Sequence, residues 1–191
     1  MPDVLKDFGY ATHAIGKYDV GYIQAGCSPT ERGFDTFLGY YTACTSDYWY
    51  HGAPGSTATH DKCGGVDFSQ STVEGGIRGA PMSGPDSLNN TYDQDVFTTR
   101  AMQIVADHDP ETPMFMYMGQ HVVHDTCQAS RTDGAKVLQA PCGTVDEYGD
   151  TQLDGWKVQA AMTTQLDYGV GNLTNALKAK GMWNDTVFVF V

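Results

Sequence analysis

The sequence predicts an α/β protein built on a mostly parallel sheet that helices cover on both faces. Segments with helical periodicity alternate along the chain with short, uninterrupted apolar segments. The apolar segments do not alternate with polar residues, which is typical of strands buried on both faces of a parallel sheet. Ligands of such sheets bind beyond the carboxyl ends of the strands, so we expect functional residues there.

The first half of the chain contains one strand that the pattern predicts. Residues 1–8 resemble the end of a helix, because their apolar side chains share one face and a glycine follows. Residues 10–16 form a short apolar segment before a glycine-bounded loop, and we expect a buried strand. Residues 21–92 are rich in Gly, Ser, Thr, Pro and Tyr and lack sustained periodicity, so we expect excursions that surround a site.

Regular elements return in the second half. Asp93 has the residue type of an N-cap and opens a helical apolar pattern that ends before two prolines. Residues 114–118 are uninterruptedly apolar and predict a strand, and an irregular stretch follows at 120–152. Apolar residues between 162 and 177 recur at helical spacing and predict a long helix. Residues 186–191 are β-branched and aromatic, and they predict a final strand.

Composition and charge exclude several classes of protein. The 191 residues are 41% hydrophobic and 18% charged, as expected of one globular domain or part of a larger one. The formal net charge of -12 would repel nucleic acid phosphates and anionic lipid. No apolar run reaches the roughly 18 residues of a candidate membrane span. The acidic residues are scattered, so they indicate solvated surface rather than a calcium cage.

Cysteines and glycosylation sequons indicate the secretory pathway. Sequons begin at Asn89, Asn172 and Asn184. The odd number of cysteines leaves one unpaired within the chain, and none has the C-x-x-C spacing of a zinc site, so disulfides or buried thiols are expected. The first residues lack a signal-peptide pattern, so we expect that a preceding segment is missing. The cysteines are Cys27, Cys44, Cys63, Cys127 and Cys142.

A lysine and an aspartate follow the strand predicted at 10–16. Lys17 and Asp19 lie two residues apart, where the lysine can hold an anion and the carboxylate can manage a proton. The alternative is an exposed surface ion pair, which the spacing alone favours.

Two histidines and a carboxylate follow the strand predicted at 114–118. His121, His124 and Asp125 suggest a metal site, but side chains three apart in an extended segment point to opposite faces. We therefore expect one histidine to face the crevice as a general acid or anion ligand. A structural histidine is the alternative.

The other polar and aromatic motifs favour structural roles. Residues 28–35 predict a turn in which Gly33 adopts an unusual backbone angle. The aromatic segment 47–50 is expected to pack, although it is also suited to an aryl substrate. Packing or surface positions are expected for His13, His51, His60 and His108.

Five segments, in this order and spacing, resemble the sulfatase family, in its branch of animal arylsulfatases similar to N-acetylgalactosamine-4-sulfatase. Residues 9–17 resemble the family segment G-Y-x-T-x-x-x-G-K-W-H-x-G, and residues 29–39 resemble P-T-x-R-G-F-D-x-x-x-G. Residues 114–124 resemble the strand that leads to a family histidine, and residues 166–172 resemble the L-D-x-x-V-G helix. Residues 181–191 are similar to the strand before the Asp-Asn-Gly-Gly metal motif.

The resemblance implies an alkaline-phosphatase-like fold and hydrolysis of sulfate esters, in aryl sulfates or sulfated glycans, at a divalent cation that is usually calcium. The family nucleophile is a formylglycine made in a C/S-x-P-S-R motif. Neither this motif nor the family's metal motifs occur in the chain. Residues 1–191 are therefore expected to be an incomplete, internal part of the catalytic domain of an extracellular or lysosomal enzyme, inactive by itself.

The resemblance also assigns roles to three residues. Lys17 matches a sulfate-binding lysine, and His124 matches the histidine near the scissile oxygen, a candidate general acid. Asp19 stands where the family has a histidine that is thought to assist the aldehyde hydrate. A carboxylate can do the same base work at a lower pKa, so we expect altered pH dependence or substrate preference rather than loss of activity.

Two other functions stay open at this point. A phosphate or phosphonate ester hydrolase shares the site plan and would carry an upstream Thr or Ser instead of the formylglycine motif. A non-catalytic, sulfatase-like module that binds sulfated glycans is the alternative outside enzymes, and Asp19 suggests it. The ordered series of motifs argues against a plain structural scaffold.

Overall fold

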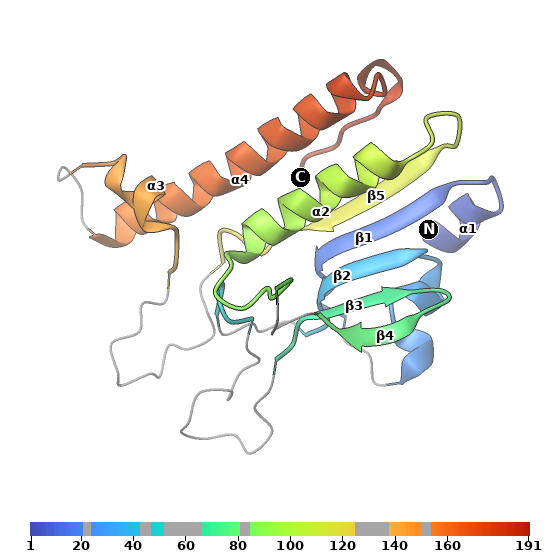
Figure 1. Ribbon diagram of the computed structural model, residues 1–191, viewed down its shortest axis with the longest axis horizontal. Helices are drawn as coiled ribbons and strands as arrows, with labels where there is room; N and C mark the ends of the chain where they lie inside the picture. The colour runs from blue at the N-terminus through green and yellow to red at the C-terminus, as the bar shows by residue number, and fades with distance from the viewer. Residues whose placement is uncertain (21–23, 43–46, 52–65, 81–84, 125–137, 150–153) are drawn as a thin grey trace.

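The computed structural model shows an α/β fold with one open, five-stranded sheet and helices packed against it (Figure 1). The predicted fold class is confirmed. The structure describes residues 1–20, 24–42, 47–51, 66–80, 85–124, 138–149 and 154–191. Outside these ranges lie Cys44, Cys63, Cys127, His60 and Asp125.

The helices and strands follow one another as α1 (Pro2–Lys6), β1 (Ala11–Lys17), η1 (Ala25–Cys27), η2 (Thr30–Arg32), β2 (Thr36–Tyr40), β3 (Ser69–Thr72), β4 (Gly76–Gly79), α2 (Asp93–Asp107), β5 (Met114–Gly119), α3 (Cys142–Asp146), α4 (Asp154–Ala179) and η3 (Trp183–Asp185).

Three neighbouring strands of the sheet are parallel. β1 pairs with β2 on one side and with β5 on the other, in the order β4-β3-β2-β1-β5. The β3–β4 hairpin extends the sheet with antiparallel strands. The ends of β1, β2 and β5 at Lys17, Tyr40 and Gly119 therefore meet at one edge, which we call the carboxyl edge. Their beginnings at Ala11, Thr36 and Met114 form the amino edge.

The sequence predicted β1 and β5 but not β2, β3 and β4. The β2 segment is short and contains Gly39, which weakens the strand pattern. β3 is mostly polar and all four residues of β4 are exposed, so neither has a continuous apolar run. These strands form because each pairs with a neighbour that is already in the sheet.

The main core lies between the sheet and the helices α2 and α4. Ile15 of β1 and Leu38 of β2 contribute from the sheet, and the methionines of β5 pack at its border. The helices supply Val96, Phe97, Ala101, Ile104, Val105, Leu173 and Leu177. Apolar residues thus recur at helical spacing on both helices, as the sequence predicted.

The second face of the sheet carries a smaller, aromatic cluster. It contains Ala14, Phe34, Phe37 and Tyr41, and Phe115 packs against it. Within the described part of the chain, both long helices pack on the first face, which differs from the expected covering of both faces. In its described residues, the connection from β1 to β2 forms the short helices η1 and η2, which are too short to cover a sheet.

The start of α2 differs from the prediction. The N-cap is Tyr92, and Asp93 is the first helical residue. The carboxylate of Asp93 does not cap the helix, because it is buried and binds side chains of the sheet's carboxyl edge. A tertiary contact has therefore replaced the local capping interaction that the residue type suggested.

The predicted strand at 186–191 is wrong. Thr186 follows η3 with an extended backbone, but none of these residues belongs to a strand, and Val187–Val191 are exposed. Extended propensity needs a paired neighbour to become a strand, and the ladders of the described sheet do not include this segment.

The long helix α4 matches its prediction, and Gly181 follows it in the left-handed conformation that commonly ends a helix (φ 79°). Across the described residues, no helix combines the length and the apolarity that a membrane crossing requires.

Candidate active site

Lys17 is the last residue of β1 and lies at the carboxyl edge. Its Cα is paired with that of Tyr40, and the amide of Tyr18 donates to the carbonyl of Tyr40 at 2.9 Å. The Lys17 side chain is only 14% exposed, and its Nζ lies 3.7 Å from Oδ1 of Asp19. The predicted pair is therefore formed, and its lysine is more buried than an ordinary surface pair would allow.

Asp19 reaches back to Lys17 because its backbone is left-handed. Its φ is 67°, a conformation that aspartate adopts more readily than most residues. The side chain is 58% exposed, so the carboxylate is open to solvent while it contacts the ammonium. This arrangement allows Asp19 to exchange protons with the solvent.

A row of three glycines crosses the sheet one residue before Lys17. Gly16 is paired with Gly39 on β2 and with Gly119 on β5. A Cβ at Gly16 would lie 2.1 Å from the carbonyl oxygen of Gly119, and a Cβ at Gly39 would lie 1.9 Å from that of Gly16. The three strands can approach this closely only because the row has no side chains.

The two predicted histidines take opposite positions beyond β5. His121 is buried, and its Nδ1 lies 2.6 Å from Oδ2 of Asp93. Its ring stacks on Tyr48, with centroids 3.9 Å apart and planes 12° apart. His124 is exposed at the carboxyl edge. His121 therefore has the packing and hydrogen-bonding environment of a structural histidine, and His124 is the one of the two that faces solvent.

Tyr40 and Tyr48 complete a buried network around His121. The hydroxyl of Tyr40 donates to Oδ2 of Asp93 at 3.1 Å. Burial, and then the charge of Asp93, hold the pKa of Tyr40 well above its usual value, so the phenol stays protonated and donates. The hydroxyl of Tyr48 donates towards the carbonyls of His121, at 3.3 Å, and His124, at 2.5 Å.

The aromatic segment 47–50 has the packing role that its pattern favoured. Tyr48 is fully buried and stacks on Tyr92, and Trp49 also packs against Tyr92. Tyr50 is exposed.

The predicted turn at 28–35 is confirmed. Gly33 ends η2 in the left-handed conformation, with φ at 97°. A Cβ there would lie 2.3 Å from the backbone nitrogen of Asp3, so the turn requires glycine. Asp35 then accepts hydrogen bonds from the backbone amide of Thr12, at 2.9 Å, and from Lys6, at 2.7 Å. The turn thereby fastens β2 to β1 at the amino edge.

The other histidines with described positions have packing roles. His13 contacts Thr36 Oγ1 at 2.8 Å, and His108 Nε2 lies 2.7 Å from the carbonyl of Thr112. His51 is fully buried beside Phe68, and burial lowers its pKa. Two cysteines with described positions, Cys27 and Cys142, are free thiols.

Comparison with known proteins identifies the family. The family model described as Sulfatase matches residues 1–191. The chain belongs to the sulfatase family. Mouse (Mus musculus) arylsulfatase J is 31% identical over 195 residues, a match that covers 100% of this chain and 28% of that protein. The chain therefore spans less than a third of the length of this curated relative.

Solved structures share the fold of this sulfatase chain. The crystal structure of Ps i-CgsB in complex with k-i-k-neocarrahexaose has a TM-score of 0.65 at 20% identity, covering 97% of this chain and 37% of that one. The PsFucS1 sulfatase from Pseudoalteromonas sp. has a TM-score of 0.61 at 17% identity, covering 95% of this chain and 34% of that one. These neighbours confirm the architecture of the open sheet and its helices.

The described residues do not form the calcium site that the resemblance implies. Nowhere in these ranges do three His, Cys, Asp or Glu side chains gather in a way that could hold a metal ion. Asp93 and His121, whose side chains could contribute to such a site, are hydrogen-bonded to each other in the core.

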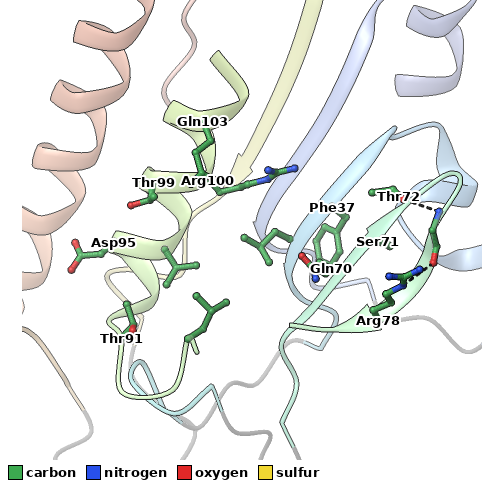
Figure 2. Close-up of a pocket in the computed structure, with 14 residues that line it drawn as sticks. Phe37, Gln70, Ser71, Thr72, Arg78, Thr91, Asp95, Thr99, Arg100 and Gln103 are labelled. Carbon is green, nitrogen blue, oxygen red and sulfur yellow. Dashed lines mark hydrogen bonds between the residues drawn. The ribbon is translucent and has the colours of Figure 1, made fainter. Parts of the chain in front are cut away.

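A cavity of about 510 Å³ lies between α2 and the sheet (Figure 2). Its lining includes Gln70 and Arg78 from the hairpin strands and Thr99, Arg100 and Gln103 from α2. It contains none of the residues that the sequence predicted as functional, so the candidate active site is the carboxyl edge and not this cavity.

The buried network of Asp93, His121, Tyr40 and Tyr48 was missed as a unit by the sequence reasoning. His121 was identified only as one of two alternatives, and Tyr48 only as a packing residue. The available signal was a polar side chain at or just past the end of two strands, since Tyr40 is the last residue of β2 and His121 lies two residues past the end of β5. The partner Asp93 is distant in sequence and gave no local sign.

Proposed function

We propose that this chain is an internal part of a sulfuric ester hydrolase that acts on aryl sulfates or sulfated glycans. The observation that carries the proposal is the position of Lys17 and His124. Lys17 is the last residue of β1, and His124 follows the adjacent parallel strand β5 at the same edge of the sheet. Ligands of open α/β sheets bind beyond the carboxyl ends of the strands, which supports this edge as the place where a sulfate would bind.

Lys17 would bind the sulfate group. Its ammonium is the charged end of a side chain that is largely buried, so it is held in place and is weakly screened by solvent. On a chain with a net charge of -12, such a local cation is needed to attract an anionic ester. Asp19 contacts the ammonium and would serve as the base that accepts a proton during the reaction.

His124 would donate a proton to the oxygen that leaves sulfur. The bond from this oxygen to sulfur breaks as the proton arrives, so that a neutral phenol or alcohol departs. The histidine is exposed at the carboxyl edge, where a substrate oxygen can reach it. The hydroxyl of Tyr48 donates to the carbonyl of His124 and so holds the turn that carries the histidine.

Sulfatases generally use a formylglycine and a divalent cation, and we propose that other parts of a longer chain supply both. The formylglycine would provide the nucleophile, and a calcium ion would stabilise negative charge on the sulfate. The absence of the C/S-x-P-S-R motif from residues 1–191 and the 28% coverage of arylsulfatase J support this division. The chain alone is then expected to be inactive.

The proposed substrate is an ester of a sulfated small molecule or of a sulfated glycan. Arylsulfatase J is named for aryl sulfates, whereas the Ps i-CgsB structure contains a neocarrahexaose. Both support an ester of a sulfated small molecule or glycan as the substrate, and the acidic net charge argues against a nucleic acid partner.

We further propose passage through the secretory pathway, to the cell exterior or the lysosome. Asn89, Asn172 and Asn184 are all exposed, as a glycan attachment site must be. Treatment of the secreted protein with an N-glycosidase should lower its mass. Replacement of any one of the three asparagines by glutamine should make this loss of mass smaller by one glycan. An unchanged mass in all cases would contradict glycosylation.

The test of the proposed function uses the full-length protein. Sulfate release from phenyl sulfate is measured for the wild type, Lys17→Ala and His124→Asn, with phenyl phosphate as the parallel substrate. We expect sulfate turnover by the wild type and a loss of about 100-fold or more in each variant. Turnover of the phosphate ester alone would favour the phosphatase alternative, and tight binding of sulfated glycan without turnover would favour the non-catalytic module.

A further inference from the structure

We infer that Asp93 is a positioning residue that holds the His124 turn at a fixed place relative to Lys17. The inference rests on the proposed function, because it concerns the geometry of those two residues. One carboxylate oxygen, Oδ2 of Asp93, accepts hydrogen bonds from two different parts of the carboxyl edge.

The first connection leads to Lys17. The Tyr40 hydroxyl binds Asp93 at 3.1 Å, and Tyr40 is the residue of β2 that is paired with Lys17. The backbone of β2 is fastened to the lysine's own strand by the hydrogen bond from the amide of Tyr18 to the carbonyl of Tyr40. Movement of Asp93 would therefore be transmitted to the strand end that carries the lysine.

The second connection leads to His124. His121 Nδ1 binds Asp93 at 2.6 Å, and the amide of His124 donates to the carbonyl of His121 at 3.1 Å. The hydroxyl of Tyr48, whose ring stacks on His121, supports the carbonyls at both ends of this turn. The turn is thus anchored through His121 to the start of α2.

The cost of burying this network indicates that its value is not stability alone. The side chains of Asp93 and His121 are 0% and 1% exposed. Removing a carboxylate from water is costly, and a buried ion or hydrogen-bond pair often contributes no more stability than an apolar pair of the same volume. The start of α2 favours a negative charge, which lowers this cost without removing it. The gain that remains is a fixed position of the His124 turn relative to Lys17.

Asp93 cannot itself touch a substrate, because it is buried beneath the edge. It acts through the turn, and the rate of proton donation depends steeply on the place of the donor. A variant that loosens the turn should therefore resemble a weak form of a His124 variant. It should not resemble a protein that is merely less stable.

The experiment compares two sulfate esters whose hydrolysis depends to different degrees on protonation of the leaving oxygen. Phenyl sulfate has a poor leaving group and needs the acid, whereas para-nitrophenyl sulfate has a good one and needs it much less. In the full-length protein, we expect Asp93→Asn to lower kcat for phenyl sulfate by about 10- to 100-fold. The loss for para-nitrophenyl sulfate should be several-fold smaller, and KM should change little for both esters.

Two milder variants keep the test decisive if Asp93→Asn fails to fold. Tyr40→Phe removes only the first hydrogen bond, and Tyr48→Phe removes only the support of the turn. Each should show the same selectivity for phenyl sulfate at a smaller magnitude. Thr144→Val is the matched control, since it removes another buried hydrogen bond, from Gln165 at 2.5 Å between α3 and α4. It should affect both esters equally.

The outcomes separate the inference from the proposed function. If the wild type releases no sulfate, or if His124→Asn loses both esters equally, the proposed function or the role of His124 fails, and the inference falls with it. If His124→Asn is selective for phenyl sulfate but the Asp93, Tyr40 and Tyr48 variants are not, only the inference is overturned.

Discussion

Two carboxylates fasten neighbouring strands at opposite edges of the sheet, Asp93 at the carboxyl edge and Asp35 at the amino edge. Asp35 accepts from a backbone amide of β1 and from Lys6 of the short first helix. Among the residues that the structure describes, Asp93 accepts from two side chains, Tyr40 and His121, that come from separate parts of the chain. The first arrangement joins two backbones, whereas the second orients two side chains.

The two carboxylates also differ in their contact with water. Asp35 is partly exposed. Burial alone would raise its pKa, but the hydrogen bonds from Lys6 and Thr12 together outweigh burial, and the pKa is lowered. Asp93 is fully buried. A partly exposed, hydrogen-bonded carboxylate loses little hydration on folding and can add to stability. A fully buried carboxylate loses much more hydration, which indicates that the positions of its partners matter. We therefore propose that the contacts of the amino edge serve stability and that those of the carboxyl edge serve function.

Disruption of the glycine row should have the largest effect. Gly16→Ala places a Cβ 2.1 Å from a carbonyl oxygen of β5 at a backbone φ of 96°, and we expect a loss of roughly 3 kcal/mol or more in the free energy of unfolding. Thermal unfolding of the full-length protein measures it. Gly79→Ala, where no atom lies within 4 Å of the new Cβ, is the control and should be nearly neutral.

Removal of a lysine from each edge separates catalysis from stability. Lys17→Met should lower kcat/KM for an aryl sulfate by about 100-fold, because the sulfate loses its cation. Lys6→Met removes the lysine that pairs with Asp35 and should leave kcat/KM unchanged. Steady-state kinetics of the two variants check this. Equal losses in both would show that the carboxyl edge is not special.

Substitution of Asp19 should change the pH profile rather than the fold. Histidine tolerates the left-handed backbone at this position, so Asp19→His should fold. A base must be deprotonated to act, and the unperturbed pKa of histidine exceeds that of aspartate by about 2.6 units. The acidic limb of the kcat profile should therefore move to higher pH.

An unmoved acidic limb in Asp19→His would contradict a catalytic role for Asp19. Asp19→Asn, which keeps the backbone tolerance but cannot ionise, is the control and should remove the limb.

The smallest effect is expected at the amino edge. Asp35→Asn should cost about 1 kcal/mol of stability at neutral pH, because the charge that Lys6 and Thr12 bind is lost. A lowered pKa in the folded state means that this stability is present above the unfolded pKa of about 3.8 and is lost as the pH falls through the folded value. The difference between variant and wild type should therefore vanish in acid, as denaturant unfolding at several pH values can measure.

The sequence was informative where a residue's role depended on its own neighbours. The apolar runs of β1 and β5 and the periodicity of α2 and α4 were sufficient to predict these elements, and Gly33 was identified from its turn. The resemblance then placed Lys17 and His124 after the two strands. In each case the signal lay within a few residues of the position that it described.

Roles that depend on distant partners were not predicted. β3 is a strand because it pairs with β2, which lies far back in the chain, whereas the segment 186–191 belongs to no strand of the described sheet. Asp93 was interpreted by its local capping preference, although its partners lie 53 and 28 residues away in the chain. A single sequence carries no direct record of such contacts.

The glycine row sets a limit on how this protein can change its substrate preference. Gly39, Gly16 and Gly119 are paired across the three central strands, so that only backbone atoms are present at this position. Because any side chain there would collide with the neighbouring strand, no mutation at these glycines can add a contact to a substrate without forcing the strands apart. Selection in the laboratory for a new ester should consequently leave these three codons untouched. Accepted substitutions should instead accumulate in the segments that follow the strands.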